Sequence, residues 1–146
     1  MSQQEDERYM RLALEEAQLA YESGEIPIGA VVVCDGRVIA RAHNEVERLS
    51  DPTAHAEVLA VTAATQHMGS KFLGDCRLYV TIEPCTMCAG ALHWARLGEV
   101  IYGASEEKFG YQRYAPEIFP RSTKVRGGVL AEEARALMQS FFRARR

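Results

Sequence analysis

Apolar and polar positions along the chain predict helices and strands in a regular order. Residues 5–22 carry apolar side chains at three- and four-residue steps, which predicts an amphipathic helix. The apolar run at 26–34 (IPIGAVVVC), the turn signal Asp35-Gly36 and the segment at 37–43 (RVIARAH) together predict a β-hairpin. The chain therefore begins with a helix that is followed by two antiparallel strands.

Beyond the hairpin, helical and strand patterns alternate. Pro52, with Asp51 or Thr53 as the cap, is predicted to begin a helix that runs to about His67. The later predicted elements are a strand at 77–82, a helix at about 85–96, strands at 99–104 (EVIYGA) and 127–130 (GGVL), and a helix at 131–146. Residues 105–125 lack clean periodicity and are expected to form an ordered loop. This order predicts one α/β domain over residues 1–146, with a mixed sheet and helices on its faces.

Composition and charge narrow the possible partners. The 146 residues are 47% hydrophobic and 25% charged, as in ordinary globular proteins. No apolar run approaches the roughly 20 residues that span a bilayer, and the acidic start MSQQEDERYM lacks a secretory signal, so we expect a cytoplasmic protein without a membrane partner. The net charge of −3 divides into −9 for residues 1–107 and +6 for residues 108–146. A basic end favours contact with an anion such as nucleic acid, although a solvated basic helix end gives the same pattern.

The cysteines suggest a metal site. Cys34 and Cys76 are isolated, whereas Cys85 and Cys88 form a C-x-x-C pair on one side of the first turn of a predicted helix. Redox pairs and structural zinc sites share this spacing, so the pair alone is only moderately specific. His55 lies near the start of another predicted helix. If these two helices lie side by side, His55, Cys85 and Cys88 bind one Zn²⁺ per chain and leave the fourth position to water, which is the pattern of catalytic zinc.

Glu57 lies two residues after His55 and is the candidate general acid and base. At the first turn of the helix both side chains can border one pocket, with the carboxylate beside the bound water. Taken alone, His55 is more often a capping or core residue, and Glu57 is more often a first-turn acid favoured by the helix dipole. Their combination with the cysteine pair favours a zinc site.

The motifs H-x-E and P-C-x-x-C together are typical of zinc-dependent nucleobase deaminases. On these motifs the sequence resembles the cytidine/deoxycytidylate deaminase superfamily, and within it the tRNA-specific adenosine deaminases. The segments that carry the resemblance are EIPIGAVVV at 25–33, His43-Asn44, DPTAHAEV at 51–58, LYVTIEPCTMCAGA at 78–91, VIYGA at 100–104 and the closing SFFRARR. They span nearly the whole chain.

The resemblance implies a fold, an activity and site residues. The fold is a three-layer α/β/α sandwich with a central mixed five-stranded sheet, as in cytidine deaminases, and the protein is a homodimer. The activity is zinc-dependent deamination of adenosine to inosine at the wobble position of a tRNA anticodon stem-loop. The implied residues are the zinc ligands His55, Cys85 and Cys88, the proton shuttle Glu57, the substrate-binding residues Asn44, Pro27, Ile28, Ala56, Glu83 and Pro84, and the RNA-binding residues Phe142, Arg143 and Arg146.

One segment departs from the family, and other functions stay open. Residues 108–116 (KFGYQRYAP) are more aromatic than the matching stretch of the family, and these aromatic residues can either pack the loop or stack on bases. A deaminase of a free nucleobase or nucleoside, of the guanine, cytosine or adenosine type, shares the zinc site but needs no basic end. An RNA-binding subunit with structural zinc needs no acid/base at Glu57. A thiol redox protein rests on the C-x-x-C pair alone.

Overall fold

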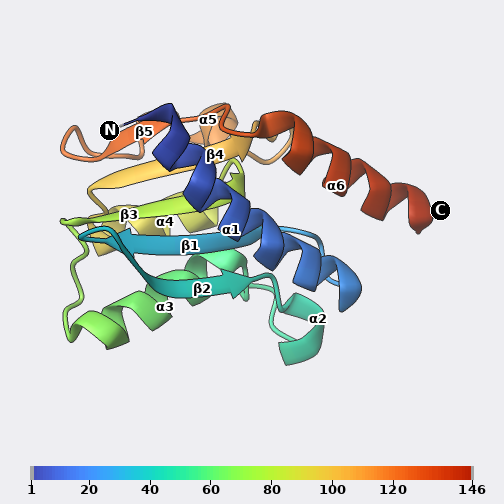
Figure 1. The fold of residues 1–146 in the computed structure, drawn as a ribbon, viewed down its shortest axis with the longest axis horizontal. Coiled ribbons are helices and arrows are strands. Elements are labelled where there is room, and N and C mark those ends of the chain that lie inside the picture. Colours follow the sequence, from blue (N-terminus) through green and yellow to red (C-terminus); the bar gives the residue numbers. More distant parts are fainter. Residues whose placement is uncertain (1, 146) are drawn as a thin grey trace.

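Five strands form one mixed sheet in the computed structural model, which describes residues 2–145 (Figure 1). The strands lie in the order β2-β1-β3-β4-β5. They are β1 (Gly29–Cys34), β2 (Arg37–His43), β3 (Cys76–Ile82), β4 (Glu99–Ala104) and β5 (Lys124–Arg126). The helices are α1 (Gln3–Glu22), α2 (Val46–Leu49), α3 (Ala56–Met68), α4 (Thr86–Ala95), α5 (Tyr111–Tyr114) and α6 (Ala131–Ala144).

Strand directions follow from the connections. β1 pairs antiparallel with β2 through the tight turn at Asp35-Gly36, and it also pairs antiparallel with β3. β3, β4 and β5 run parallel, and helical or loop crossovers connect them. A tight turn can join only antiparallel neighbours, whereas parallel neighbours need a longer crossover, so the mixed sheet predicted from the sequence is confirmed.

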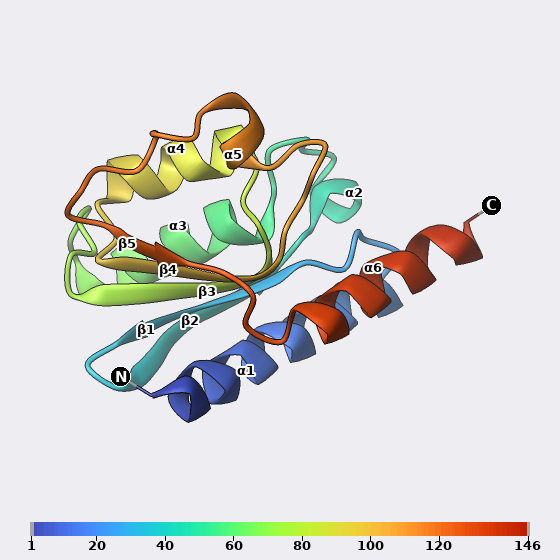
Figure 2. The same ribbon diagram turned by 90° about the horizontal axis from the view of Figure 1, so that it is seen from above.

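Helices cover both faces of the sheet. α1 and α6 lie on one face, and α3 and α4 lie on the other (Figure 2). β1 is buried along its whole length because its side chains alternate between the two layers. Val32 packs in the core beneath α3 and α4, while Val31 and Val33 pack against α1. The predicted three-layer arrangement is therefore confirmed. No helix within residues 2–145 has both the length and the apolar character needed to cross a membrane.

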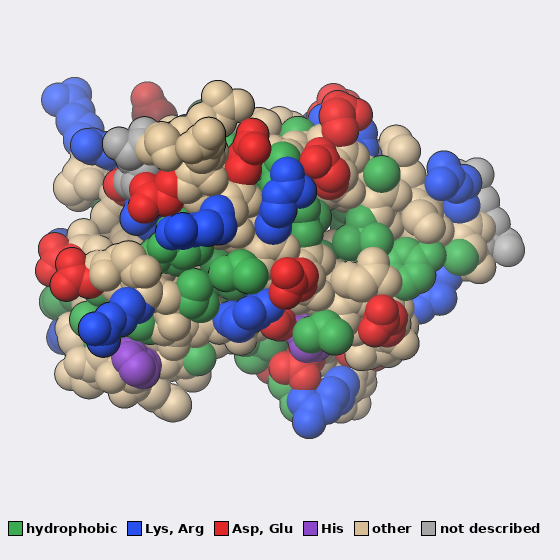
Figure 3. All heavy atoms as spheres, in the orientation of Figure 1, with side chains coloured by type: hydrophobic (Ala, Val, Ile, Leu, Met, Phe, Trp, Pro, Cys, Tyr) green, Lys and Arg blue, Asp and Glu red, His purple; other side chains and the backbone are tan. Residues whose placement is uncertain are grey.

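The charge separation along the sequence is partly cancelled in space. Arg126, from the basic part of the chain, donates to both carboxylate oxygens of Asp6 at 2.8 Å and to Glu99 at 2.6 Å. Arg135 pairs with Glu132 one turn away on α6. On the face shown in Figure 3, acidic and basic side chains are interspersed. Only Arg126 among these pairs joins the basic part of the chain to the acidic part, since Arg135 and Glu132 both lie within residues 108–146.

Three local predictions were wrong. α3 begins at Ala56 and not at Pro52, because Asp51 accepts hydrogen bonds from the backbone N–H and the hydroxyl of Thr53 and closes a separate turn. The last strand is Lys124–Arg126, and the GGVL segment lies outside it, since Gly128 has a positive φ of 89°. The segment at 105–125 is not all loop, since it contains α5. The short helix α2 was also not predicted.

Candidate metal centre and active site

The candidate site lies where α3 and α4 begin. His55 is the N-cap residue of α3 and Cys85 is the N-cap residue of α4, and both have extended backbones with ψ of 153° and 172°. Cys88 follows within the first turn of α4. Because α3 and α4 pack side by side on the same face of the sheet, their N-termini face each other and bring the three side chains together. The sequence prediction that these helix starts meet is confirmed.

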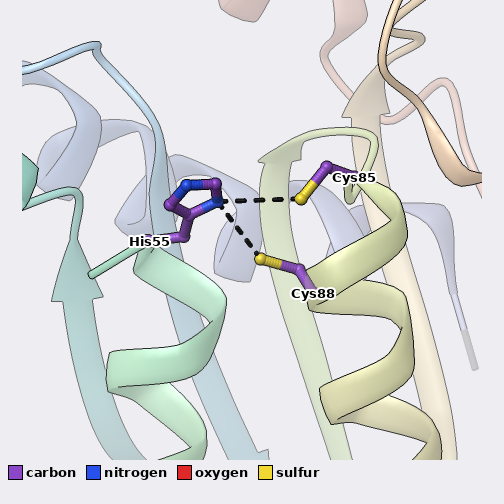
Figure 4. Close-up of side chains that lie close together, drawn as sticks. All are labelled: His55, Cys85 and Cys88. Carbon is purple, nitrogen blue, oxygen red and sulfur yellow. Dashed lines mark hydrogen bonds between the residues drawn. The ribbon is translucent and has the colours of Figure 1, made fainter. Parts of the chain in front are cut away.

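The three side chains have the geometry of a metal site. His55 Nδ1 lies 3.7 Å from Cys85 Sγ and 3.4 Å from Cys88 Sγ, and the three candidate ligand atoms lie within 4.8 Å of one another (Figure 4). Tetrahedral zinc, with Zn–S near 2.3 Å and Zn–N near 2.0 Å, places nitrogen and sulfur ligands roughly 3.5 Å apart. The observed separations bracket this value. An imidazole and two thiols are also the donor types that zinc prefers, so the residues fit the ion.

Local hydrogen bonds already favour a thiolate at this site. A hydrogen bond from the Cys88 thiol, together with the nearby His55, lowers the pKa of Cys85 to about 4, although burial opposes the change. Donating that hydrogen bond, together with burial, raises the pKa of Cys88. The hydrogen bond with Cys85 raises the pKa of His55. A bound cation favours deprotonation of both thiols and neutral imidazole, which are the forms that coordinate a metal.

Glu57 lies beside these ligands and not among them. Its side chain points inward from the first turn of α3 and is only 4% exposed. Burial raises the pKa of Glu57 to about 7, while hydrogen bonds from its own backbone N–H and from Cys88 act in the opposite direction. Glu57 is thus a buried carboxyl group that contacts Cys88 but does not belong to the ligand cluster, and its role as a general acid/base stays a prediction.

Asn44 ties the preceding strand to the start of α3. Its Oδ1 accepts a hydrogen bond of 2.8 Å from the N–H of Ala56, and its own N–H donates to the Ile28 carbonyl at 3.1 Å. Pro27 is buried next to Ile28. Four of the six residues for which the resemblance implies a role in substrate binding, Pro27, Ile28, Asn44 and Ala56, therefore lie together at the His55 side of the site. Their contact with substrate stays a prediction.

Glu83 and Pro84 lie on the opposite side, immediately before Cys85. The Pro84 carbonyl accepts a hydrogen bond of 2.9 Å from the N–H of Tyr111. The Glu83 carboxylate is buried and accepts from the N–H groups of Glu106 and Gln112. The structure thus turns the carboxylate of Glu83 towards the loop after β4, a contact that the sequence did not indicate.

Two of the RNA-binding residues predicted near the C-terminus, Phe142 and Arg143, lie on α6. Phe142 is exposed, and with Arg143, Met138, Gln139 and Glu106 it lines an open groove of about 440 Å³. This groove runs between α6 and the loop after β4 that Glu83 contacts. Arg146 lies outside the described residues.

Comparison with known proteins identifies the family. The profile of the MafB19-like deaminases matches residues 4–146. The chain is 44% identical over 147 aligned residues to the tRNA-specific adenosine deaminase of Streptococcus pyogenes serotype M18, and the alignment covers 97% of this chain and 92% of the relative. The chain belongs to the family of tRNA-specific adenosine deaminases. The resemblance drawn from the HAE and PCTMC motifs is thereby confirmed.

Solved structures of similar proteins agree with the fold. A structure from a study of A-to-I editing by tRNA:A34 deaminases at the wobble position superimposes with a TM-score of 0.83 at 41% identity, covering 89% of this chain and 98% of that one. A guanine deaminase from Bacillus subtilis superimposes with a TM-score of 0.67, also at 41% identity, covering 77% and 75% of the two chains. The chain therefore resembles solved structures of deaminases that act on two different substrates, tRNA and guanine.

Sequence reasoning missed two features around the site. Glu25 is buried and accepts hydrogen bonds from the N–H groups of Glu47 and Arg48 in α2. Gly110 forms an isolated β-bridge with Cys85. The sequence offers one signal for Glu25, which is an acidic residue next to an apolar run in EIPIG. Glu83 has the same setting in TIEPC. The carboxylates of Glu25 and Glu83 both accept from backbone N–H groups more than 20 residues further along the chain. No sequence pattern indicates such partners, because every residue except proline has a backbone N–H.

Proposed function

We propose that this protein converts adenosine to inosine at the wobble position of tRNA, with one zinc ion per chain. The observation that carries the proposal is the cluster of His55, Cys85 and Cys88, whose ligand atoms lie within 4.8 Å of one another, with the buried Glu57 beside it. Three protein ligands and one open position distinguish a catalytic zinc site from a structural one. Membership of the adenosine deaminase family supports the choice of substrate.

The reaction replaces the amino group of the base with oxygen from water and releases ammonia. When bound, zinc lowers the pKa of a coordinated water to about 7 and so supplies a nucleophile at neutral pH. Glu57 would accept a proton from the attacking water and deliver it to a ring nitrogen, while the water oxygen bonds to the amine-bearing carbon. Glu57 would then take the remaining proton from the added hydroxyl and transfer it to the amino group, so that the C–N bond breaks, ammonia leaves and a carbonyl remains. Asn44 binds the nucleotide, because its Oδ1 is already used by the Ala56 N–H and its NH₂ group remains to donate.

The RNA lies along the groove between α6 and the loop after β4. Phe142 offers an aromatic face to a base, and Arg143 contacts phosphate. A base in an anticodon loop is already unpaired, so its extrusion into the site costs little. Phosphate contacts predict binding that weakens steeply as salt concentration rises. Arg146 is expected to contribute in the same way.

Turnover measurements on two kinds of substrate test this function. We expect the purified protein to convert the wobble adenosine of an anticodon stem-loop, which mass spectrometry detects as a gain of about one dalton at that nucleotide. Free adenosine, guanine and cytosine should react far more slowly. The similarity to a guanine deaminase makes guanine the second candidate substrate. Turnover of guanine without turnover of the stem-loop would refute the tRNA proposal and leave the zinc chemistry intact.

The oligomeric state, location and domain organisation follow from the same proposal. We expect a homodimer, as the family resemblance implies, formed by one domain per chain in the cytoplasm where tRNA is found. Analytical ultracentrifugation tests the dimer, and a single species of 16.3 kDa would contradict it.

A further inference from the structure

Glu25 and Glu83 are two buried carboxylates near the site. Within residues 2–145, the hydrogen bonds that their side chains accept all come from backbone N–H groups. Glu25 is 2% exposed, and its two oxygens accept from the N–H groups of Glu47 at 3.0 Å and Arg48 at 2.8 Å. Glu83 is 5% exposed, and its two oxygens accept from the N–H groups of Glu106 at 3.0 Å and Gln112 at 3.1 Å. Hydrogen bonds to a charged acceptor are stronger than neutral ones, so each carboxylate fixes one stretch of backbone firmly.

These two stretches of backbone lie on opposite sides of the metal ligands. Glu25 holds α2, within the connection that runs from Asn44 to His55. Glu83 holds the loop at 106–112, which includes the start of α5. In Figures 1 and 2, α2 and α5 both lie at the end of the helical layer where α3 and α4 begin. The α2 segment therefore lies at the start of α3, and the loop at 106–112 lies at the start of α4, so the two segments flank the ligand cluster.

The loop at 106–112 also pairs with the backbone at Cys85. Gly110 forms a β-bridge with Cys85, and the next N–H, that of Tyr111, donates to the Pro84 carbonyl. A Cβ atom on Gly110 would lie 2.4 Å from Glu83 Oε2 and 2.5 Å from its Cδ, far inside van der Waals contact. The loop thus packs directly on the Glu83 carboxylate, and a residue larger than glycine at 110 would displace it.

A carboxylate suits this role better than an amide does. Both oxygens of Glu83 accept from N–H groups, whereas a glutamine presents one acceptor oxygen and one NH₂ donor. In Glu83→Gln, one backbone N–H therefore loses its partner and faces another donor. Because the contacts are to backbone, the side chains of the loop remain available to a ligand, and Phe109 is 64% exposed. We call each carboxylate with its two backbone N–H donors a clamp. Such a clamp does not depend on the side chains of the loop, so it is compatible with the unusual aromatic sequence there.

We propose that Glu25 and Glu83 are positioning residues for substrate binding, whose carboxylates fix the two segments that flank the ligand cluster in the arrangement that a large substrate requires. The proposal rests on the function proposed above, because an anticodon stem-loop is large enough to reach both segments, whereas a free base is not. Neither carboxylate touches the reacting atoms. The two residues therefore affect how substrate is held more than how it reacts.

Steady-state kinetics on an anticodon stem-loop test the proposal. Glu83→Gln and Glu25→Gln should each raise KM by about tenfold, which is the effect of losing one hydrogen bond, with kcat within about threefold of wild type. Zinc content should stay near one per chain. The matched controls are Glu107→Gln for the loop and Glu47→Gln for α2, since both remove the same charge from exposed side chains on the same segments. These controls should change KM by less than about twofold.

Gly110→Ala perturbs the same contact from the other side and serves if a glutamine variant fails to fold. It should raise KM in the same way, since the added Cβ atom displaces the loop and leaves Glu83 unchanged. A purely structural role predicts the opposite pattern, with loss of zinc or of kcat at constant KM, and that result would overturn the inference. If wild type turns over the stem-loop and KM is unchanged in all three variants, this inference is overturned and the proposed function stands. No stem-loop turnover by wild type would overturn the proposed function and, with it, this inference.

Discussion

Replacing Asn44 should separate its structural role from a role in substrate binding. Its Oδ1 accepts the 2.8 Å hydrogen bond from the N–H of Ala56, the first residue of α3, and both residues are buried. Asn44→Ala leaves that N–H without a partner and out of reach of water, and an unpaired buried donor costs about 1–3 kcal/mol. A loss of about 2 kcal/mol corresponds to a fall in Tm of roughly 4–8 °C for a chain of this size.

Asn44→Asp should behave differently. The carboxylate still accepts from the Ala56 N–H, and a negative charge is favourable at a helix N-terminus, so Tm should fall much less than in Asn44→Ala. The variant lacks the NH₂ group that we expect to donate to the nucleotide. Losing one hydrogen bond to substrate should lower kcat/KM by about tenfold or more. Stability and activity thus change separately in the two variants.

Thermal unfolding, zinc content and kcat/KM on the stem-loop measure these effects. Asp51→Ala is the control, since it removes a 2.8 Å hydrogen bond to the N–H of Thr53 in an exposed turn where water replaces the lost acceptor. It should cost less than about 1 kcal/mol. If Asn44→Ala costs no more than this control, the hydrogen bond to Ala56 does not hold the start of α3. If Asn44→Asp keeps full activity, the amide does not contact substrate.

Two further predictions concern the face of the sheet opposite the site. Burial pushes the pKa of Asp6 up, but the hydrogen bonds from Arg126 outweigh burial and leave that pKa below its usual value. A lowered folded-state pKa gives stability that is present above the unfolded pKa of about 3.9 and is lost as pH falls through the folded value, so Asp6→Asn should be less stable than wild type at pH 7. In urea unfolding this difference should shrink below about pH 4, and a constant difference down to pH 2 would contradict the link. Gly29→Ala should lose about 3 kcal/mol or more in the same assay, because its Cβ atom would lie 2.1 Å from the Ala13 carbonyl oxygen of α1. Gly90→Ala is the control, because its Cβ atom would lie 3.9 Å from the nearest side chain, and its stability should be unchanged or slightly higher. If Gly29→Ala loses no more stability than this control, α1 moves to make room for the added Cβ atom.

Much of the fold could be predicted because local patterns agree with the tertiary structure. The hairpin follows from Asp35-Gly36, whose turn needs positive φ at both residues, and these have φ of 57° and 74°. The start of α3 was misplaced because Asp51-Pro52-Thr53 has the residues of a helix cap, yet the same side chains close a turn before the helix. The helix itself begins after His55, whose backbone is extended and whose ring lies at the metal site.

The metal ligands were predictable for a different reason. His55, Cys85 and Cys88 have the donor types that zinc prefers, and the combination of the H-x-E and P-C-x-x-C motifs suggests their association. The clamps at Glu25 and Glu83 could not be predicted, because their partners are backbone N–H groups that any residue supplies. Only the tertiary structure places α2 and the loop at 106–112 against these carboxylates.

The central claim is that the three ligands hold zinc and that Glu57 moves the protons. Mass analysis of a stem-loop after incubation with Glu57→Ala, alongside metal analysis of the same sample, tests it most directly. The account predicts zinc near one per chain, as in wild type, and no inosine, because the ligands are intact and the proton shuttle is gone. Inosine formation at the wild-type rate by Glu57→Ala, or by wild type stripped of its zinc, would contradict it.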